Sequence, residues 1–202
     1  MSLLFLHLFT KKQAVPLSQK GGFGLIELMV SISIMMLVSA VILARQSSFN
    51  GAVLLRSQVY DIALAVREVQ LGAVSAESNG SGLFRSVDGV YLDTANDSAY
   101  KVFRDANNNH YYDAVEQFGK QGVIDNRFQI RDIRAVGGTI RGTGVSVVFE
   151  RPNFDARFFD TVGEISGATS VEIDIARRGV AGNTNDVVRT LEITKSGQIT
   201  VK

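Results

Sequence analysis

The sequence contains no cysteine, so disulfide bridges and thiolate metal sites are excluded. It has two histidines, His7 and His110, which lie far apart in the chain. A histidine zinc site or a Ser-His-Asp triad would have to use one of them. The G-x-S-x-G, H-E-x-x-H and P-loop patterns are lacking as well. The sequence therefore predicts a protein that is not an enzyme, and an exported enzyme on a membrane anchor would depend on His110.

An excess of charge of one sign is also lacking. The formal net charge is +1, which argues against a protein that binds nucleic acid through bulk charge. The charge is unevenly divided, because residues 1–22 contain three lysines and no acid. The rest of the chain holds 18 basic and 20 acidic side chains, so removing residues 1–22 would reverse the sign. This pattern is typical of a disposable basic leader.

A long apolar run follows the leader, from Phe23 to Ala44, with no proline and a single charge, Glu27. As a helix it would span roughly 33 Å, enough to cross the core of a bilayer. Lysines precede the run, and the next basic residue, Arg45, comes only after it. The positive-inside tendency therefore predicts a cytoplasmic N-terminus and an exported remainder.

Glu27 is the unusual feature of this run. A signal peptide cut near "VSA" or a plain single-pass anchor would explain the apolar residues but not the carboxylate. An ionised carboxylate costs about 2.5–3.5 kcal/mol at the centre of a membrane helix, and less near the interface. A cut between Gly22 and Phe23 would expose an α-amino group and make Glu27 the fifth residue. Two such helices with an axial offset would pair the amine of one with the carboxylate of the other, which favours assembly.

The segment "GGFGLIELMV" (residues 21–30) resembles the processing motif of type IV pilins and type II secretion pseudopilins. The resemblance implies that a membrane prepilin peptidase cuts after Gly22 and that the new amine of Phe23 is methylated. It also implies that Glu27 guides assembly into a filament. Many pilins carry a helix-kinking proline late in the apolar segment, and this apolar segment has none.

Residues 45–80 read as an amphipathic helix that packs on a sheet. Apolar residues recur at spacings of four and three and form one helix face. A free-standing coiled coil is the alternative, but the stripe is short for one. The turn-rich "ESNGSG" (residues 77–82) then ends the helix. The members of the apolar face are Leu55, Val59, Ile62, Val66 and Val69.

Residues 81–202 read as an antiparallel β domain. Apolar and polar residues alternate clearly in "SVEIDIA" and "RTLEITK", which predicts a sheet with one solvated face. "KSGQI" predicts the turn of a final hairpin. The fold class is therefore α+β and pilin-like, a long N-terminal helix, transmembrane in its first half, on an antiparallel sheet. The predicted strands are GVYLD, AYKVFRD, RFQIRDI, GVSVVFE, DARFFD, TSVEIDIAR, VVRTLEIT and GQITVK.

One loop, "DANNNHYYDAVE" (residues 105–116), has the spacing of an EF-hand calcium loop. Oxygen-bearing residues occupy its positions 1, 3, 5, 7, 9 and 12, and the seventh contributes its backbone carbonyl. Two features depart from an EF-hand: position 6 is His110 where glycine is expected, and a strand precedes the loop. The alternative is a polar turn whose side chains cap their own backbone. The predicted calcium ligands are Asp105, Asn107, Asn109, Tyr111, Asp113 and Glu116.

The loop also resembles the Asp- and Asn-rich loop of H-type minor pseudopilins. The resemblance implies a minor structural subunit in the bacterial inner membrane, with its sheet domain in the periplasm or outside the cell. Its implied partners are prepilin peptidase, other pilins or minor pseudopilins, and an inner-membrane assembly platform. The alternative is a minor pilin that binds DNA or a surface ligand, although scattered charge more often marks a solvated sheet face. The basic residues available for that role are Arg177, Arg178, Arg189, Lys195 and Lys202.

Overall fold

The computed structural model describes residues 22, 24–75, 87–118, 121–149 and 154–202. Phe23, most of the predicted leader and the predicted helix break at residues 77–82 lie outside this part of the chain. The chain divides into two compact units, Met1–Ala44 and Arg45–Lys202.

The predicted N-terminal helix is confirmed as α1, which runs from Leu25 to Val74. Its first backbone hydrogen bond joins the Leu28 N–H to the carbonyl oxygen of Gly24 at 3.1 Å. No proline occurs within it, so no backbone donor is missing from the helical ladder.

The strands of Arg45–Lys202 form two antiparallel sheets, which confirms the predicted α+β class. All eight predicted runs become strands, and the structure adds two strands of two residues each. The six-stranded sheet has the order β3-β2-β1-β5-β6-β7, and the four-stranded sheet has the order β10-β9-β8-β4. The strands are β1 (Val87–Asp93), β2 (Ala99–Asp105), β3 (Gly122–Val123), β4 (Phe128–Val136), β5 (Gly144–Phe149), β6 (Ala156–Asp160), β7 (Gly163–Glu164), β8 (Ser170–Arg177), β9 (Val188–Thr194) and β10 (Ile199–Val201).

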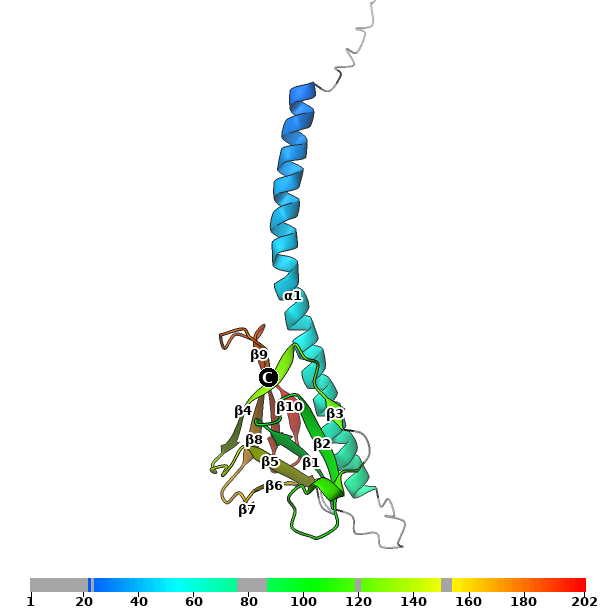
Figure 1. The fold of residues 1–202 in the computed structure, drawn as a ribbon, viewed down its shortest axis with the longest axis vertical. Helices are drawn as coiled ribbons and strands as arrows, with labels where there is room; N and C mark the ends of the chain where they lie inside the picture. The colour runs from blue at the N-terminus through cyan, green and yellow to red at the C-terminus, as the bar shows by residue number, and fades with distance from the viewer. Residues whose placement is uncertain (1–21, 23, 76–86, 119–120, 150–153) are drawn as a thin grey trace, which may run out of the picture. The chain divides into compact units, whose positions relative to one another are not determined.

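The second half of α1 shares one hydrophobic core with both sheets, and Figure 1 shows it lying beside β2, β3 and β10. The five apolar residues predicted for its buried face are all in that core, between 0 and 7% exposed. They face strand residues such as Val90, Val147, Ile173 and Leu191. The period of the sequence therefore identified the side of the helix that the sheets cover.

Two polar side chains of α1 attach its last turns to the sheets. The buried Gln70 donates its Nε2 hydrogens to the carbonyl oxygens of Phe154 at 2.9 Å and Gly197 at 3.0 Å. Arg67 donates to the carbonyl oxygen of Ile199 at 3.3 Å, at the edge strand β10. These bonds satisfy carbonyl groups that the strands leave unpaired, which matters because an unpaired buried carbonyl is costly.

Candidate functional site

The apolar start of α1 has the length and composition of a membrane span. Leu25–Ala44 has 20 residues and a mean hydropathy of 2.4, and none of it is buried. It is the one helix of this kind in the described part of the chain. At about 1.5 Å per residue it covers about 30 Å, the thickness of a bilayer core.

Within this span Glu27 is the single charged residue, and it lies exposed in the first turn of α1. Within the described residues its carboxylate makes no hydrogen bond or ion pair. The nearby hydroxyl groups are satisfied locally, because Ser31 and Ser33 each donate to the carbonyl oxygen four residues earlier at 2.8 Å. Gly22 is exposed, and Phe23 is not among the described residues. The pairing of the Phe23 amine with the Glu27 carboxylate therefore stays a prediction.

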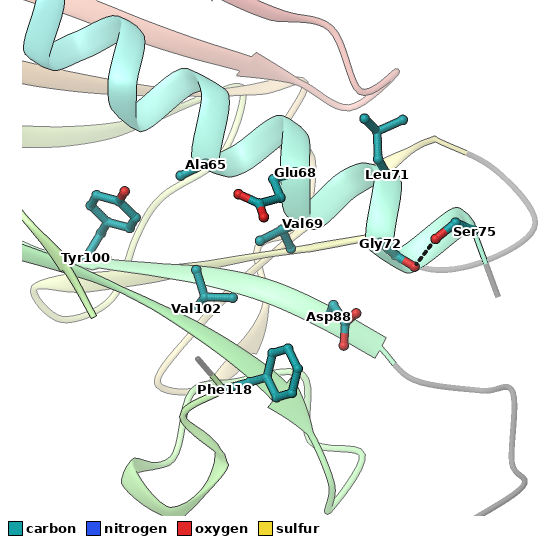
Figure 2. Close-up of a pocket in the computed structure, with 10 residues that line it drawn as sticks. All are labelled: Ala65, Glu68, Val69, Leu71, Gly72, Ser75, Asp88, Tyr100, Val102 and Phe118. Atoms are coloured by element: carbon teal, nitrogen blue, oxygen red, sulfur yellow. Dashed lines mark hydrogen bonds between the residues drawn. The ribbon is translucent and has the colours of Figure 1, made fainter. Parts of the chain in front are cut away.

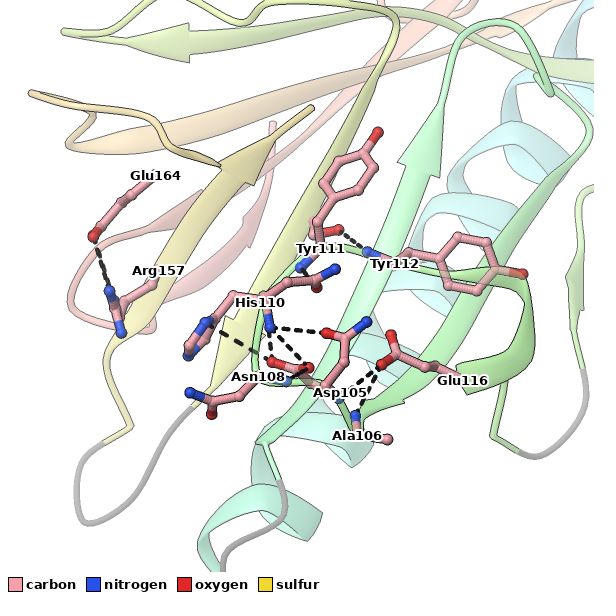
Figure 3. Close-up of polar contacts among 12 residues, drawn as sticks. Asp105, Ala106, Asn108, His110, Tyr111, Tyr112, Glu116, Arg157 and Glu164 are labelled. Atoms are coloured by element: carbon pink, nitrogen blue, oxygen red, sulfur yellow. Dashed lines mark hydrogen bonds and ion pairs between the residues drawn. The ribbon is translucent and has the colours of Figure 1, made fainter. Parts of the chain in front are cut away.

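The second predicted site is the loop between β2 and η1, a short 3-10 helix (Ala114–Glu116). The carboxylate of Asp105 accepts backbone N–H bonds from Asn108 at 2.6 Å, Asn109 at 3.2 Å and His110 at 2.8 Å (Figure 3). One carboxylate thus closes the first half of the loop around itself.

The backbone at loop positions 4 and 6 has positive φ angles, 65° at Asn108 and 63° at His110. Residues with side chains rarely adopt this conformation, although Asn and His do so more often than most. His110 is held in it by the N–H bond to Asp105 and by stacking on Phe159, with ring centroids 4.8 Å apart. Glycine is the residue expected at this position of a calcium loop, and the structure shows that His110 adopts the positive φ angle there.

Glu116 and Asp113 close the second half of the loop. The buried Glu116 accepts the N–H groups of Ala106 at 2.9 Å and Asn107 at 3.2 Å. Asp113 accepts the side-chain amides of Asn107 at 2.6 Å and Asn109 at 3.0 Å. The carboxylate and amide groups of the loop therefore bond to its own backbone and side chains, as the polar-turn interpretation expects.

The six predicted ligands lie in one loop, but their oxygen atoms face backbone and amide donors. Among the described residues, no group of three or more acidic or histidine side chains is arranged to hold a metal. Calcium would require the amides of Asn107 and Asn109 to turn their oxygens toward Asp113. The positive φ angles at positions 4 and 6 and the set of oxygen atoms are compatible with calcium, so calcium binding stays a prediction.

An aromatic cluster beneath the loop was not predicted. Tyr91 and Tyr112 stack with their centroids 5.0 Å apart, and Tyr111 packs edge-on against Tyr91 at 5.5 Å. Burial raises the pKa of the Tyr91 phenol, and the hydrogen bond with Tyr111 adds to this. The cluster covers Phe103 and Val148 on the sheet face opposite α1. The signal for this cluster was the composition of β5, which is apolar except for Ser146 and is buried at every position, as expected of a strand covered on both faces.

His110 does not resemble a catalytic base. Its Nδ1 lies 3.8 Å from a carboxylate oxygen of Asp105, and its buried Nε2 has no hydrogen-bond partner among the described residues. Nearby, Arg157 donates to Glu164 at 2.8 Å, and this bond lowers the pKa of the Glu164 carboxyl. The Arg157–Glu164 bond joins β6 to β7, and the stacking of His110 on Phe159 holds the loop against β6.

Two of the five basic residues considered for DNA binding, Arg178 and Lys202, have acidic partners in the described structure. Arg178 makes two hydrogen bonds to Asp97, at 2.9 and 3.0 Å. Lys202 lies 3.0 Å from both Glu172 and Glu192. Because these cations already have acidic partners, the solvated-face interpretation explains them.

Comparison with known proteins places one family signature on this chain. Residues 17–43 match the family described as the prokaryotic N-terminal methylation motif. No curated protein and no solved structure matches the chain. The motif contains Gly22, Phe23 and Glu27 and most of the apolar span. It supports a type IV pilin-like subunit that is anchored in a membrane, processed by prepilin peptidase and assembled with other pilins.

Proposed function

We propose that this chain is a structural minor subunit of a type II secretion pseudopilus or a related pilus-like filament, of the H type. The observation that carries the proposal is the methylation motif, placed directly over an exposed apolar helix with one acid in its first turn. A pilin-like subunit has no reaction to perform, and its work is assembly.

In this proposal prepilin peptidase cuts after Gly22, and the amine of Phe23 is methylated. The subunit waits in the bacterial inner membrane with Arg45–Lys202 on the periplasmic side, since lysines precede the span. An assembly platform then moves it into a filament beside other pilins or minor pseudopilins. Leaving lipid is favourable for Glu27 because a neighbouring amine can neutralise it, whereas lipid cannot.

Mass spectrometry of the protein purified from its natural membrane tests the processing step. We expect the mature chain to begin at Phe23 and to carry one added methyl group on its amine. A Gly22→Val variant, which enlarges the residue before the cut, is expected to accumulate as the uncut precursor. A natural product that begins at Met1, or that is cut after Ala44, would contradict the proposal.

We further propose that calcium braces the loop at residues 105–116. The loop gathers the negative charges of Asp105, Asp113 and Glu116 in a protein that has no disulfides. Calcium binds through six to eight oxygen ligands, which such a loop can supply. Calcium at 100 times its Kd would add about 2.7 kcal/mol to the free energy of unfolding. Its role would be structural, and it would hold the loop on the aromatic cluster.

Thermal melts of the full chain in detergent, with calcium or with magnesium, test this. We expect calcium to raise the melting temperature by several degrees, and magnesium to do so much less. The matched variant is Asp113→Asn, which removes one charge but keeps the side-chain size, and its melting temperature should no longer respond. If calcium releases no heat on titration and leaves the wild-type melting temperature unchanged, the loop is a self-capped turn.

A further inference from the structure

The second half of α1 carries an apolar stripe on the side away from the sheets. Its four members recur at spacings of seven, four and seven residues, as a helix seam does. None is covered by another part of the described structure, although the opposite side of the same helix lies in the core. They are Val53, 51% exposed, Tyr60, 43%, Leu64, 63%, and Leu71, 59%.

The two borders of this stripe carry opposite charges. Arg56 lies on the side of β10, whereas Arg67, seven residues after Tyr60, occupies a position of the stripe itself and donates to Ile199. Asp61 and Glu68 lie on the side of β2, close enough to Tyr100 to raise its pKa after the larger effect of burial. Figure 2 shows Glu68 beside the stripe residue Leu71, which points away from Tyr100.

Neither Asp61 nor Glu68 makes a hydrogen bond or ion pair within the described residues, and both are exposed. Arg56 lies over the Tyr60 ring at 5.5 Å and reaches the Tyr60 hydroxyl at 3.4 Å. It therefore borders the apolar seam without an acidic partner of its own among these residues. Among the described residues, the stripe is thus bordered by Arg56, which has no acidic partner, and by Asp61 and Glu68, which have no basic partner.

We propose that this stripe packs in parallel against the same stripe of a second copy of the chain, with Arg56 of each copy facing Asp61 of the other. The inference rests on the proposed function and deepens it, because it names a contact between two subunits held in one membrane.

The choice of a parallel second copy follows from the charges. If Tyr60 and Leu64 are seam positions, Arg56 and Asp61 flank the seam on opposite sides, five residues apart. In a parallel pair of helices, flanking residues with this separation face each other across the seam. Two identical helices then make the Arg56–Asp61 contact twice. An antiparallel pair would instead place basic borders together and acidic borders together, which is unfavourable.

The stripe is short, but the two copies need not find each other in free solution. The apolar span holds both in the same bilayer and gives both the same direction. Confinement of this kind raises the effective concentration, so a contact too weak for a soluble dimer becomes populated. This explains how four exposed apolar residues can act without a longer coiled coil.

Oxidative cross-linking in membranes tests the contact, and the absence of cysteine from the chain gives a clean background. We expect full-length Leu64→Cys to form a disulfide dimer about tenfold more efficiently than Val162→Cys. Val162 is a matched control, since it is 67% exposed and lies in the turn between β6 and β7. Equal cross-linking of the two variants overturns the proposal.

Charge reversal in the Leu64→Cys background tests the direction of packing. Arg56→Asp or Asp61→Arg alone should lower the dimer yield about fivefold, which corresponds to about 1 kcal/mol. The double variant, which exchanges the charges, should restore it. Cross-linking that ignores both reversals overturns the parallel arrangement. The N-terminal mass of each sample is measured alongside, so a failure of processing is distinguished from a failure of this contact.

Discussion

Gly197→Ala is expected to lower the melting temperature of the protein by about 10 °C. Gly197 has φ 79° in the turn between β9 and β10, a left-handed conformation that costs alanine about 1–2 kcal/mol. A Cβ atom there would also overlap the carbonyl oxygen of Phe154 and approach Nε2 of Gln70 to 2.5 Å. Moving either group breaks the bonds by which Gln70 attaches α1 to the sheets. Together these effects remove about 4 kcal/mol from the free energy of unfolding.

The matched control for this experiment is Gly179→Ala. Gly179 has φ 73°, but no atom lies within 4 Å of the position its Cβ would take. This variant therefore carries the conformational cost alone, and we expect a fall in melting temperature of about 3–5 °C. Circular dichroism melts of both variants measure the difference. If the melting temperature falls by the same amount in both variants, the hydrogen bonds of Gln70 do not contribute to the stability of the protein.

The elements predicted from the sequence are those in which the pattern of apolar and polar residues repeats several times. The buried face of α1 recurs over four turns, and β8 and β9 alternate over seven or eight residues. The two-residue strands β3 and β7 have no period of their own. They are strands only because β2 and β6 lie beside them, at the edges of the six-stranded sheet. Such edges are decided by tertiary pairing, which local sequence does not contain.

Gln70 shows a second limit of sequence reasoning. In a helix pattern it reads as a surface residue, but it is buried. Its two carbonyl partners lie 84 and 127 residues further along the chain, so the reason for its burial appears only once the chain is folded. The opposite stripe of α1 was hidden for a different reason. Its apolar residues are spaced seven, four and seven residues apart, so the denser four- and three-residue spacing on the other side identifies the face that the sheets take and says nothing about this stripe.

The candidate loop was predicted by composition but not by conformation. Acidic and amide residues at alternate positions identified a place where oxygen atoms gather. The carboxylate of Asp105 accepts hydrogen bonds from three backbone N–H groups. This arrangement depends on the positive φ angles at Asn108 and His110. The ring of His110 also stacks on Phe159, which lies in another strand. The choice between polar turn and metal loop therefore depends on chemistry outside the loop.

Glu27→Gln is expected to lower the yield of assembled filament about tenfold or more, since each 1.4 kcal/mol lost at the subunit contact is a factor of ten. Glutamine keeps the size of the side chain but has no charge to pair with the amine of a neighbour. It also costs less in lipid than a carboxylate, so the unassembled subunit is stabilised while the filament is weakened. Both effects act in the same direction.

We expect processing to be unaffected by this change, because the predicted cut between Gly22 and Phe23 lies before α1, which begins at Leu25. The measurement is the ratio of filament to membrane fractions after shearing, with the mature N-terminal mass recorded for each. Ser31→Ala is the matched control. It removes a polar group one turn further along the span, where the hydroxyl bonds only to the carbonyl oxygen of Glu27 in the described structure. Normal filament yield from Glu27→Gln would show that the carboxylate has no part in assembly, and the charge pairing inferred from the motif would then be wrong.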